Sequence, residues 1–446
     1  MIRRHPLLVV AGAAAMTLGS LASAAPAAAD QPGKIEHVVV LMQENHTFDN
    51  YFGTFPGADG PPPGTCMPVD PGVKGGKCVR PYHLDSTRTV DLHHGTDTAR
   101  AAYNGGRMDG FVATQNARNL PGEIAMGYYD GRDLPYYWNL ATDYVLADRF
   151  FSSSMGASLE GHMYWVTGAG ETRIPAQGFE MQTIFDRLQA AGVDWKFYIQ
   201  NYDPSVTYRN PNLDSAKSAQ LIWAPVLNFA RFLDDPALNS RIVDLDEYFR
   251  DLANDTLPAV AFMVPSGASE HPPGDVTNGH YFATKVITSL MRSESWWNSL
   301  FVLTYDDWGG WYDHVTPPQI DSEGYGYRVP TLFISPYVRH GTIDSTVYDY
   351  TSILRFIEEN WKLQPLTARD ATANSIGAAL DLARAPAAPR FPAPVYPRVP
   401  KEDPKSRVPL LAAYSGVVVL FIAGAVIVRR RSDRFSQTTT GEGVAA

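Results

Sequence analysis

Largely apolar runs alternate with segments of helical periodicity over most of this chain. The first run, residues 35–42 (IEHVVVLM), and a later one, residues 300–305 (LFVLTY), are typical of strands that are buried on both faces. This alternation predicts an α/β protein with a mostly parallel central sheet flanked by helices. We expect further strands at 195–199, 259–264 and 329–335, and helices at 184–191, 245–252, 282–291 and 352–361.

The first 29 residues have the layout of a secretory signal peptide. Arg3 and Arg4 precede an apolar stretch at 7–21, and alanine-rich small-x-small sequences follow at 22–24 and 27–29. Either sequence suits signal peptidase. We therefore predict a signal peptide over residues 1–29, exported by the general route or, given the arginine pair, by the twin-arginine route.

Residues 410–428 form an uncharged apolar run that is followed at once by three arginines, residues 429–431. Such a run can cross a bilayer core of ~30 Å as a helix, and basic residues beside a span stay in the cytoplasm. The sequence predicts a single-pass membrane protein of the cell surface, with a transmembrane helix at 410–428 and a cytoplasmic tail at 429–446. The alternative, a buried core helix, fits poorly with the proline-rich segment before it.

Prolines recur every two to five residues between 384 and 409. This spacing opposes helix and sheet and favours an extended polyproline conformation. We predict a semi-rigid stalk at 384–409 and a single folded domain at 30–383. Within that domain, residues 52–108 are rich in glycine and proline and predict long loops. Cys66 and Cys78, the two cysteines of an exported chain, predict a disulfide that staples them.

The net charge of the chain is −10, from 37 basic and 47 acidic residues. Nucleic-acid binding usually requires a basic surface that replaces the counterions of the phosphates. An acidic chain of this kind predicts no nucleic-acid partner, and its charge leaves the oligomeric state open.

Polar side chains follow two of the predicted strands at the point where each strand ends. Gln43, Glu44 and Asn45 follow the first strand, and Asp306 and Asp307 follow the strand at 300–305. Functional groups of open α/β sheets gather beyond the carboxyl ends of the strands, and oxygen ligands of this kind suit divalent cations. The alternative is that these residues cap helices or open turns. Two such clusters favour a metal site.

Several hydroxyl groups lie together in a turn at residues 152–158, which includes Ser152, Ser153, Ser154 and Ser158. A metal ion could activate any of them by lowering its pKa. The chain has no convincing G-x-S-x-G elbow with triad partners in order and no phosphate-binding G-x-x-x-x-G-K-[ST] loop. Periodicity alone does not choose among the serines.

Five segments occur in an order that resembles a known family. They read QENHTFDNYFG (43–53), GRMDGF (106–111), SEHPPGD (269–275), TYDDWGGWYDHVTPP (304–318) and YRVPTLFISPYVRHGTIDSTVYDYTSILRFIE (327–358). They are similar to motifs of the bacterial phosphoesterase family, which contains phospholipases C and a class of acid phosphatases. The resemblance implies an alkaline-phosphatase-like α/β fold and a hydrolase that acts on phosphoric ester bonds.

The resemblance also implies roles for individual residues. Glu44, Asn45, Asp306 and Asp307 would ligate one or more divalent metal ions. The family's nucleophile lies in a G-P-[ST]-x-P-N-[RH] sequence, and residues 156–162 read GASLEGH, so Ser158 is the implied nucleophile. Alanine and glycine replace the proline and asparagine of that pattern, which weakens any inference about the substrate.

Histidines bind phosphate and donate protons in this family, and His94, His271 and His314 lie at matching positions. His162 replaces an arginine found in many phospholipase members, and it would contact phosphate or pack in the core. The pair Trp308 and Trp311 would line a substrate pocket and could hold a choline headgroup by cation–π attraction. For all of these residues the alternative is a purely structural role.

The resulting hypothesis is an extracytoplasmic, metal-dependent hydrolase that forms a phosphoserine intermediate. Its substrate would be a phospholipid or a small phosphate ester, cut in the manner of a phospholipase C or an acid phosphatase. The alternative is a surface binding protein that keeps the fold and has lost catalysis, but no ligand or nucleophile of the pattern is missing.

Overall fold

The computed structural model describes residues 34–212, 216–267 and 269–397, and all statements below concern these residues. The predicted signal peptide, the apolar run at 410–428 and the tail at 429–446 lie outside them. Within the described residues, no helix is both long and apolar enough to cross a membrane.

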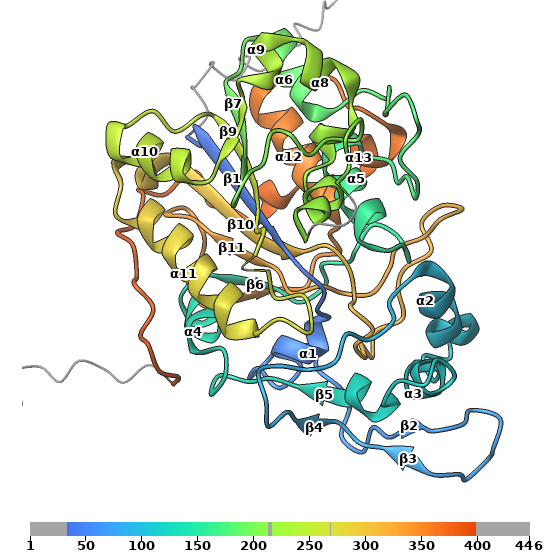
Figure 1. The fold of residues 1–446 in the computed structure, drawn as a ribbon. Coiled ribbons are helices and arrows are strands. Elements are labelled where there is room, and N and C mark those ends of the chain that lie inside the picture. Colours follow the sequence, from blue (N-terminus) through green and yellow to red (C-terminus); the bar gives the residue numbers. More distant parts are fainter. Residues whose placement is uncertain (1–33, 213–215, 268, 398–446) are drawn as a thin grey trace, which may run out of the picture.

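An eight-stranded sheet forms the centre of the described chain (Figure 1). Seven strands are parallel to one another, and β11 runs antiparallel to both of its neighbours. The predicted α/β class with a mostly parallel sheet is confirmed. In order across the sheet the strands are β12 (Thr342–Asp344), β6 (Val145–Ala147), β11 (Leu332–Ile334), β10 (Ser299–Tyr305), β1 (His37–Gln43), β9 (Val260–Val264), β7 (Trp195–Ile199) and β8 (Ile242–Asp244).

The strand predicted at 329–335 is shorter in the structure and reverses direction. A parallel neighbour requires a crossover connection, usually a helix. The described residues 306–331, which join β10 to β11, hold no helix, so the chain turns back beside β10.

Helices cover both faces of the sheet (Figure 1). On one side lie α5 (Ser158–Thr167), α6 (Ile184–Ala191) and α12 (Tyr350–Trp361), and on the other lie α4 (Pro135–Asp143), α10 (Asp246–Asn254) and α11 (Val276–Met291). The predicted helices at 184–191, 245–252, 282–291 and 352–361 correspond to α6, α10, α11 and α12. The largest difference is at α11, which begins six residues earlier than predicted, where the Asp275 side chain accepts a hydrogen bond from Thr277 N and caps the helix. Short helices complete the fold: α1 (Phe48–Phe52), α2 (Thr96–Tyr103), α3 (Phe111–Asn116), α7 (Gln220–Trp223), α8 (Ala230–Asp234), α9 (Pro236–Asn239) and α13 (Ala368–Thr372).

Residues 52–108 form a layer below the sheet in Figure 1 that is mostly loop, as predicted. Two small sheets occur there, β2 (Met67–Pro68) with β3 (Cys78–Val79), and β4 (Tyr82–His83) with β5 (Gly127–Tyr128). Cys66 and Cys78 form a disulfide across the first of them. The helix α2 was not predicted, because its threonine- and alanine-rich sequence carries only a narrow apolar face.

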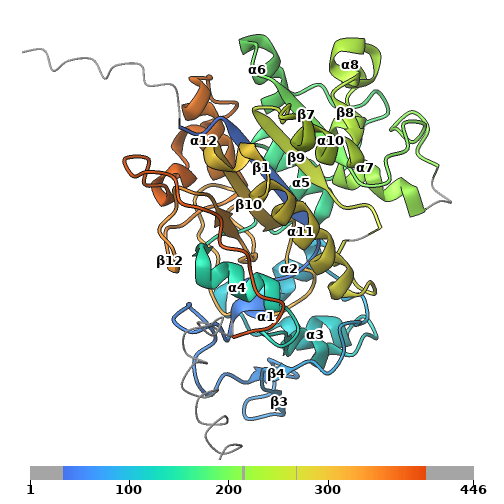
Figure 2. The ribbon, with the colours of Figure 1, turned by 90° about the vertical axis from the view of Figure 1, so that its left-hand side faces the viewer.

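The first half of the predicted stalk is part of the folded domain. Residues 384–397 run in extended form along the surface beside α4 and α11 (Figures 1 and 2). Trp296 Nε1 donates to Ala387 O at 3.0 Å, and Asn139 Nδ2 donates to Val395 O at 2.8 Å. The ring of Tyr396 packs edge-on against Trp138, with 5.0 Å between their centroids. The domain boundary predicted at 383 is therefore wrong, because these contacts hold the chain to the domain as far as residue 397.

Candidate active site

The ends of strands β1 and β10 bring the two predicted acidic clusters together. The strands are adjacent and parallel, and Gln43 pairs with Tyr305 at their carboxyl ends. The residues that follow are therefore neighbours: Asn45 N donates to Asp306 Oδ1 at 3.1 Å, and Asp306 N donates to Gln43 O at 3.1 Å. The register of two neighbouring strands thus builds the candidate metal site.

Helix α5 carries Ser158 to these strand ends. Ser158 is the first residue of the helix, and its Oγ donates to Asp307 Oδ2 at 3.0 Å. His162 lies one turn further along the same face, and its Nε2 is 3.0 Å from Glu44 Oε1. Of the four serines left open by periodicity, the structure places Ser158 against a predicted metal ligand, whereas Ser153 Oγ donates to Asp349 in α12's cap. The role of Ser158 as nucleophile stays a prediction.

Gly161 permits the close approach of α5 to the end of β10. A Cβ at this position would lie 2.4 Å from the carbonyl oxygen of Asp306, which is backbone and cannot move aside. The absence of a side chain at residue 161 therefore sets the distance between the helix and the acidic cluster.

Gly161→Ala is expected to lower both stability and activity. Overpacking typically costs about 1–3 kcal/mol, which outweighs the roughly 1 kcal/mol that alanine gains over glycine within a helix. Because Ser158 moves with the helix, kcat should fall about 10²-fold. Thermal unfolding and steady-state kinetics measure the two effects. Gly72→Ala is the matched control. A Cβ at this position would lie 3.2 Å from Asp70 Oδ1, which belongs to a side chain and can move aside. Equal effects of the two substitutions would contradict the argument.

The carboxylates of the cluster are removed from solvent. Glu44 and Asp306 are fully buried, and Asp307 is 1% exposed. Burial, followed by repulsion from Asp306 and Asp307, raises the pKa of Glu44 well above its usual value. Burial and the charge of Asp306 raise the pKa of Asp307 to about 7. Three buried acids in contact are costly unless a positive charge lies among them.

The donor atoms in the cluster fit a divalent cation. Ligand atoms of Glu44, His162 and Asp306 all lie within 4.8 Å of one another. Asp306 Oδ2 is buried without a hydrogen-bond partner among the described residues. The terminal amide atom of Asn45 that faces the acids lies 2.6 Å from Glu44 Oε2 and 3.3 Å from Asp306 Oδ1. With the amide nitrogen in that place, Asn45 donates to both carboxylates and its oxygen accepts from His94 Nε2; with the oxygen there, as a metal ligand requires, the close approach of three acceptors calls for a cation between them. The residues present therefore suit the predicted metal ion.

His94 and His271 lie beside this cluster and close to each other, with ring centroids 5.4 Å apart. His94 Nε2 is 2.9 Å from the Asn45 amide, and its Nδ1 is 2.7 Å from Leu92 O. Burial is the largest single effect and lowers the pKa of His94, but the Asp307 carboxylate, the contact with Leu92 O and the charges of Asp91 and Asp306 together outweigh it, so the pKa is raised. Both histidines are partly exposed, and His271 Nδ1 faces the carbonyl oxygen of Pro272.

His314 belongs to a different network. Its Nδ1 is 2.8 Å from Asp49 Oδ2, and its Nε2 is 3.3 Å from Asp59 Oδ1. The buried Arg328 guanidinium binds Asp49 and Asp313 in the same network, at 2.8 and 2.9 Å. These contacts tie α1 to the loop that follows β10. The structure therefore places His314 in this carboxylate network, and its catalytic role stays a prediction.

Trp308 and Trp311 are 1% and 0% exposed, so they do not line a substrate pocket as predicted. Trp308 Nε1 donates to His94 O at 3.0 Å, and Trp311 stacks on His46 with 5.6 Å between centroids. The turn at Gly309–Gly310 directs both indoles inward, where they pack beneath the site. His162 is also buried completely and contacts Glu44, which corrects its predicted role as a substrate-binding residue.

The motifs alone did not reveal the roles of Trp223 and Glu270. The Trp223 side chain hydrogen-bonds to the Glu44 carboxylate. Glu270 is fully buried and accepts hydrogen bonds from the hydroxyls of Tyr51, Tyr137 and Tyr305 at 2.5–2.7 Å. It anchors the segment that carries His271. A buried acid next to a predicted catalytic histidine was a usable signal for Glu270, whereas Trp223 lies in no recognisable motif.

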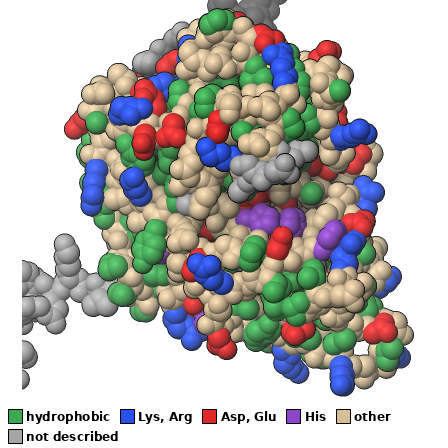
Figure 3. Space-filling view, in the orientation of Figure 1, with side chains coloured by type: hydrophobic (Ala, Val, Ile, Leu, Met, Phe, Trp, Pro, Cys, Tyr) green, Lys and Arg blue, Asp and Glu red, His purple; other side chains and the backbone are tan. Residues whose placement is uncertain are grey.

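A cavity of about 640 Å³ opens beside the cluster, and Trp223, His271, Tyr202 and Lys217 line it. Figure 3 shows a hollow in the centre of the face that is turned to the viewer in Figure 1, with histidine side chains on the floor of the hollow.

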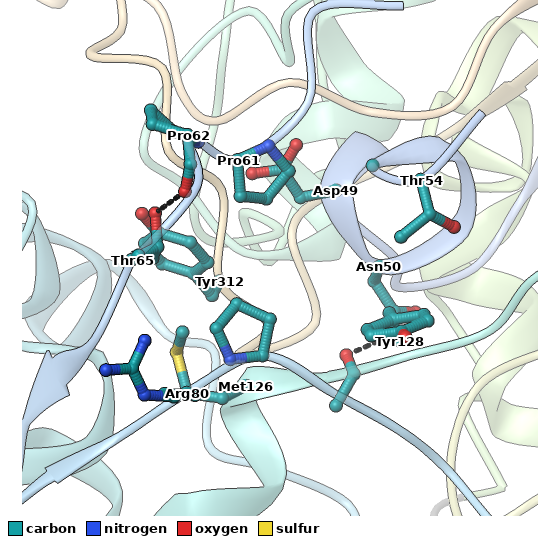
Figure 4. Close-up of a pocket in the computed structure, with 14 residues that line it drawn as sticks. Asp49, Asn50, Thr54, Pro61, Pro62, Thr65, Arg80, Met126, Tyr128 and Tyr312 are labelled. Carbon is teal, nitrogen blue, oxygen red and sulfur yellow. Dashed lines mark hydrogen bonds between the residues drawn. The ribbon is translucent and has the colours of Figure 1, made fainter. Parts of the chain in front are cut away.

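A separate pocket of about 300 Å³ lies below α1. Figure 4 shows Thr65 bonded to Pro62 on one side of it and Asn50 and Tyr128 on the other. The smaller pocket contains none of the predicted ligands, so the larger cavity is the candidate substrate site.

Comparison with known proteins identifies the family. The Phosphoesterase family matches residues 35–364, which is most of the chain and includes both acidic clusters, Ser158 and the candidate histidines. This chain belongs to the phosphoesterase family. The resemblance of its motifs is thereby confirmed, and its enzyme class is that of a hydrolase acting on phosphoester bonds.

Named relatives of this phosphoesterase come from bacteria and plants. Phospholipase C B of Mycobacterium tuberculosis is 30% identical over 461 residues, covering 87% of this chain and 86% of that protein. Hemolytic phospholipase C of Pseudomonas aeruginosa is 30% identical over 397 residues, covering 73% of this chain, which spans only about half (53%) of that relative's length. Non-specific phospholipase C6 of Arabidopsis thaliana is 29% identical and covers 87% of this chain and 80% of that protein. A solved member of the alkaline phosphatase superfamily from Vibrio parahaemolyticus aligns with 76% of this chain and 69% of its own, at 12% identity and a TM-score of 0.38.

Proposed function

We propose that this phosphoesterase is an extracytoplasmic, metal-dependent hydrolase that uses Ser158 as its nucleophile. The observation that carries the proposal is the contact between Ser158 Oγ and Asp307 Oδ2, at 3.0 Å, at the edge of a buried acidic cluster that fits a cation. The N-terminus of α5 adds the positive end of the helix dipole at the same place.

Glu44, Asn45, Asp306 and Asp307 are the residues that would hold the metal ion. A bound divalent ion would lower the pKa of the nearby hydroxyl and polarise a phosphoryl oxygen. This assignment uses only groups that the fold already brings together.

The protein side chains account for the proton movements. As Ser158 Oγ attacks phosphorus, its proton leaves along the hydrogen bond to Asp307 Oδ2 and passes to solvent. The bond from phosphorus to the leaving oxygen breaks, and His271 supplies the proton that this oxygen needs. Water then attacks the phosphoserine and gives a proton to His271, the phosphorus–Oγ bond breaks, Ser158 Oγ takes a proton back from solvent by the same route, and the phosphate product leaves.

Two substrate classes fit the proposal: phosphodiesters, as the names of the relatives suggest, and phosphomonoesters. The cavity beside His271 combines the cation Lys217 with the aromatic side chains of Trp223 and Tyr202, which suits a phosphate that carries an organic group. The full-length protein is to be assayed on phosphatidylcholine vesicles, bis(p-nitrophenyl) phosphate and p-nitrophenyl phosphate. A diesterase cuts the first two and a monoesterase only the last. Inactivity on all three after metal loading would refute the proposed function.

No specific observation favours the alternative of an inactive binding protein, since Ser158 and all four candidate ligands are present.

We further propose that residues 1–29 direct export and that residues 410–428 anchor the enzyme at the cell surface. Protease treatment of intact cells tests this: the catalytic domain is expected to be cleaved while the tail stays protected. Protection of the whole chain would refute the proposed orientation.

A further inference from the structure

We propose that His162 is a ligand of the metal site and gives it a preference for a transition-metal ion such as Zn²⁺ over Mg²⁺ and Ca²⁺. This inference rests on the proposed function and deepens it. The family pattern allows arginine or histidine at this position, and only histidine offers an imidazole nitrogen as a ligand.

The position of the imidazole fits direct coordination. His162 is four residues after Ser158 on α5, so both side chains point to the ends of β1 and β10. Its Nε2 lies 3.0 Å from Glu44 Oε1 and 3.8 Å from Asp306 Oδ2. Two ligands bound at about 2.0–2.2 Å to one tetrahedral or octahedral ion lie roughly 3–3.6 Å apart. The spacing to Glu44 lies within this range, and the spacing to Asp306 slightly exceeds it.

An unmatched polar atom in the same place supports a bound ion. His162, Glu44 and Asp306 are all 0% exposed. Asp306 Oδ2 has no hydrogen-bond partner among the described residues, although buried polar atoms are nearly always paired. An ion pair between His162 and Glu44 alone would leave Asp306 Oδ2 unmatched. A cation between the three side chains engages that oxygen and offsets the excess of negative charge.

The type of donor determines which ion the site prefers. Mg²⁺ and Ca²⁺ take oxygen ligands, and Mg²⁺ retains several waters. Imidazole nitrogen favours Zn²⁺, Co²⁺ and their neighbours, in the Irving–Williams order. Adding an imidazole to the oxygen ligands should therefore raise the affinity for Zn²⁺ and Co²⁺ far more than that for Mg²⁺.

The test is metal binding by full-length protein that has been stripped with a chelator. Zn²⁺, Co²⁺, Mg²⁺ and Ca²⁺ are titrated by calorimetry into the wild type and His162→Gln. Glutamine can still donate a hydrogen bond to Glu44, so this variant retains a structural contact and loses the ligand. We expect the affinity for Zn²⁺ and Co²⁺ to fall about 100-fold, with a changed Co²⁺ absorption spectrum, while the affinity for Mg²⁺ and Ca²⁺ changes less than about threefold. His280→Gln is the control, because His280 is buried in α11 and accepts a hydrogen bond from Tyr136 N, away from the cluster.

Unchanged Zn²⁺ affinity and Co²⁺ spectrum in His162→Gln would overturn the inference while leaving the proposed function intact. A wild type that binds none of the four ions would instead defeat the proposed function itself. If His162→Gln fails to fold, X-ray absorption of the Zn²⁺-loaded wild type and of His94→Gln decides the question. Imidazole scattering in both proteins supports coordination of the ion by His162. Absence of imidazole scattering from the wild type rejects that coordination.

Discussion

Ser158→Ala is expected to lower kcat at least about 10⁴-fold, the scale observed when a hydrolase loses its nucleophile. The substitution removes the hydroxyl that donates to Asp307 and leaves Glu44, Asn45 and Asp306 in place. The affinity for the metal should therefore change little. Steady-state kinetics on the substrate that the wild type prefers, together with calorimetric metal titration, measures both quantities.

Two further measurements make this prediction specific. Rapid acid quenching of the wild type during turnover should trap phosphate on Ser158, which mass spectrometry of the digested protein detects. Ser152→Ala serves as the matched control, because Ser152 is also buried and its Oγ donates only to the backbone oxygen of Ser154. If Ser158→Ala keeps more than a tenth of the wild-type kcat, another nucleophile is at work.

Removal of the metal ion is expected to abolish activity and to weaken the fold. An ion present at 100 to 1,000 times its dissociation constant stabilises the native state by about 3–4 kcal/mol. Chelation should thus lower Tm by roughly 5 °C for a domain of this size, and Zn²⁺ should restore it. Scanning fluorimetry and activity assays on the same samples test both effects.

The stability loss should grow with pH, because the acids of the site are held together without a counter-charge. Asp307 has its pKa raised from 3.8 to about 7, so in the metal-free native state it binds a proton that the unfolded chain has already lost. This contribution to stability is fully present below about pH 4 and is lost as pH rises to about 7. The Tm difference between loaded and stripped protein should widen over that interval. A constant difference, or retained activity after chelation, would contradict the metal site.

The sequence predicted the elements that build the site better than the contacts within it. Two apolar strands that end in acids could be recognised in the sequence. The register of β1 with β10 brings those acids close together, as expected for neighbouring parallel strands. The direction of β11 was not predictable from its apolar pattern, which is the same for either orientation.

The tertiary contacts of single side chains were the least predictable part. The four-residue spacing of Ser158 and His162 was readable, but the docking of α5 that places His162 against Glu44 depends on Gly161 and the backbone of Asp306. Trp308 follows an active-site acid in sequence and still points into the core. Residue type and spacing do not specify such directions.

The contacts of residues 384–397 with α4 and α11 limit how far the enzyme can work from a membrane. Under the proposed anchoring, only residues 398–409 separate the last attached residue from the apolar run. A chain of this length spans at most about 40 Å even when fully extended, compared with about 90 Å for the whole of 384–409. The catalytic domain would then remain within about its own diameter of the lipid surface, and substrates in that same membrane would be within its reach.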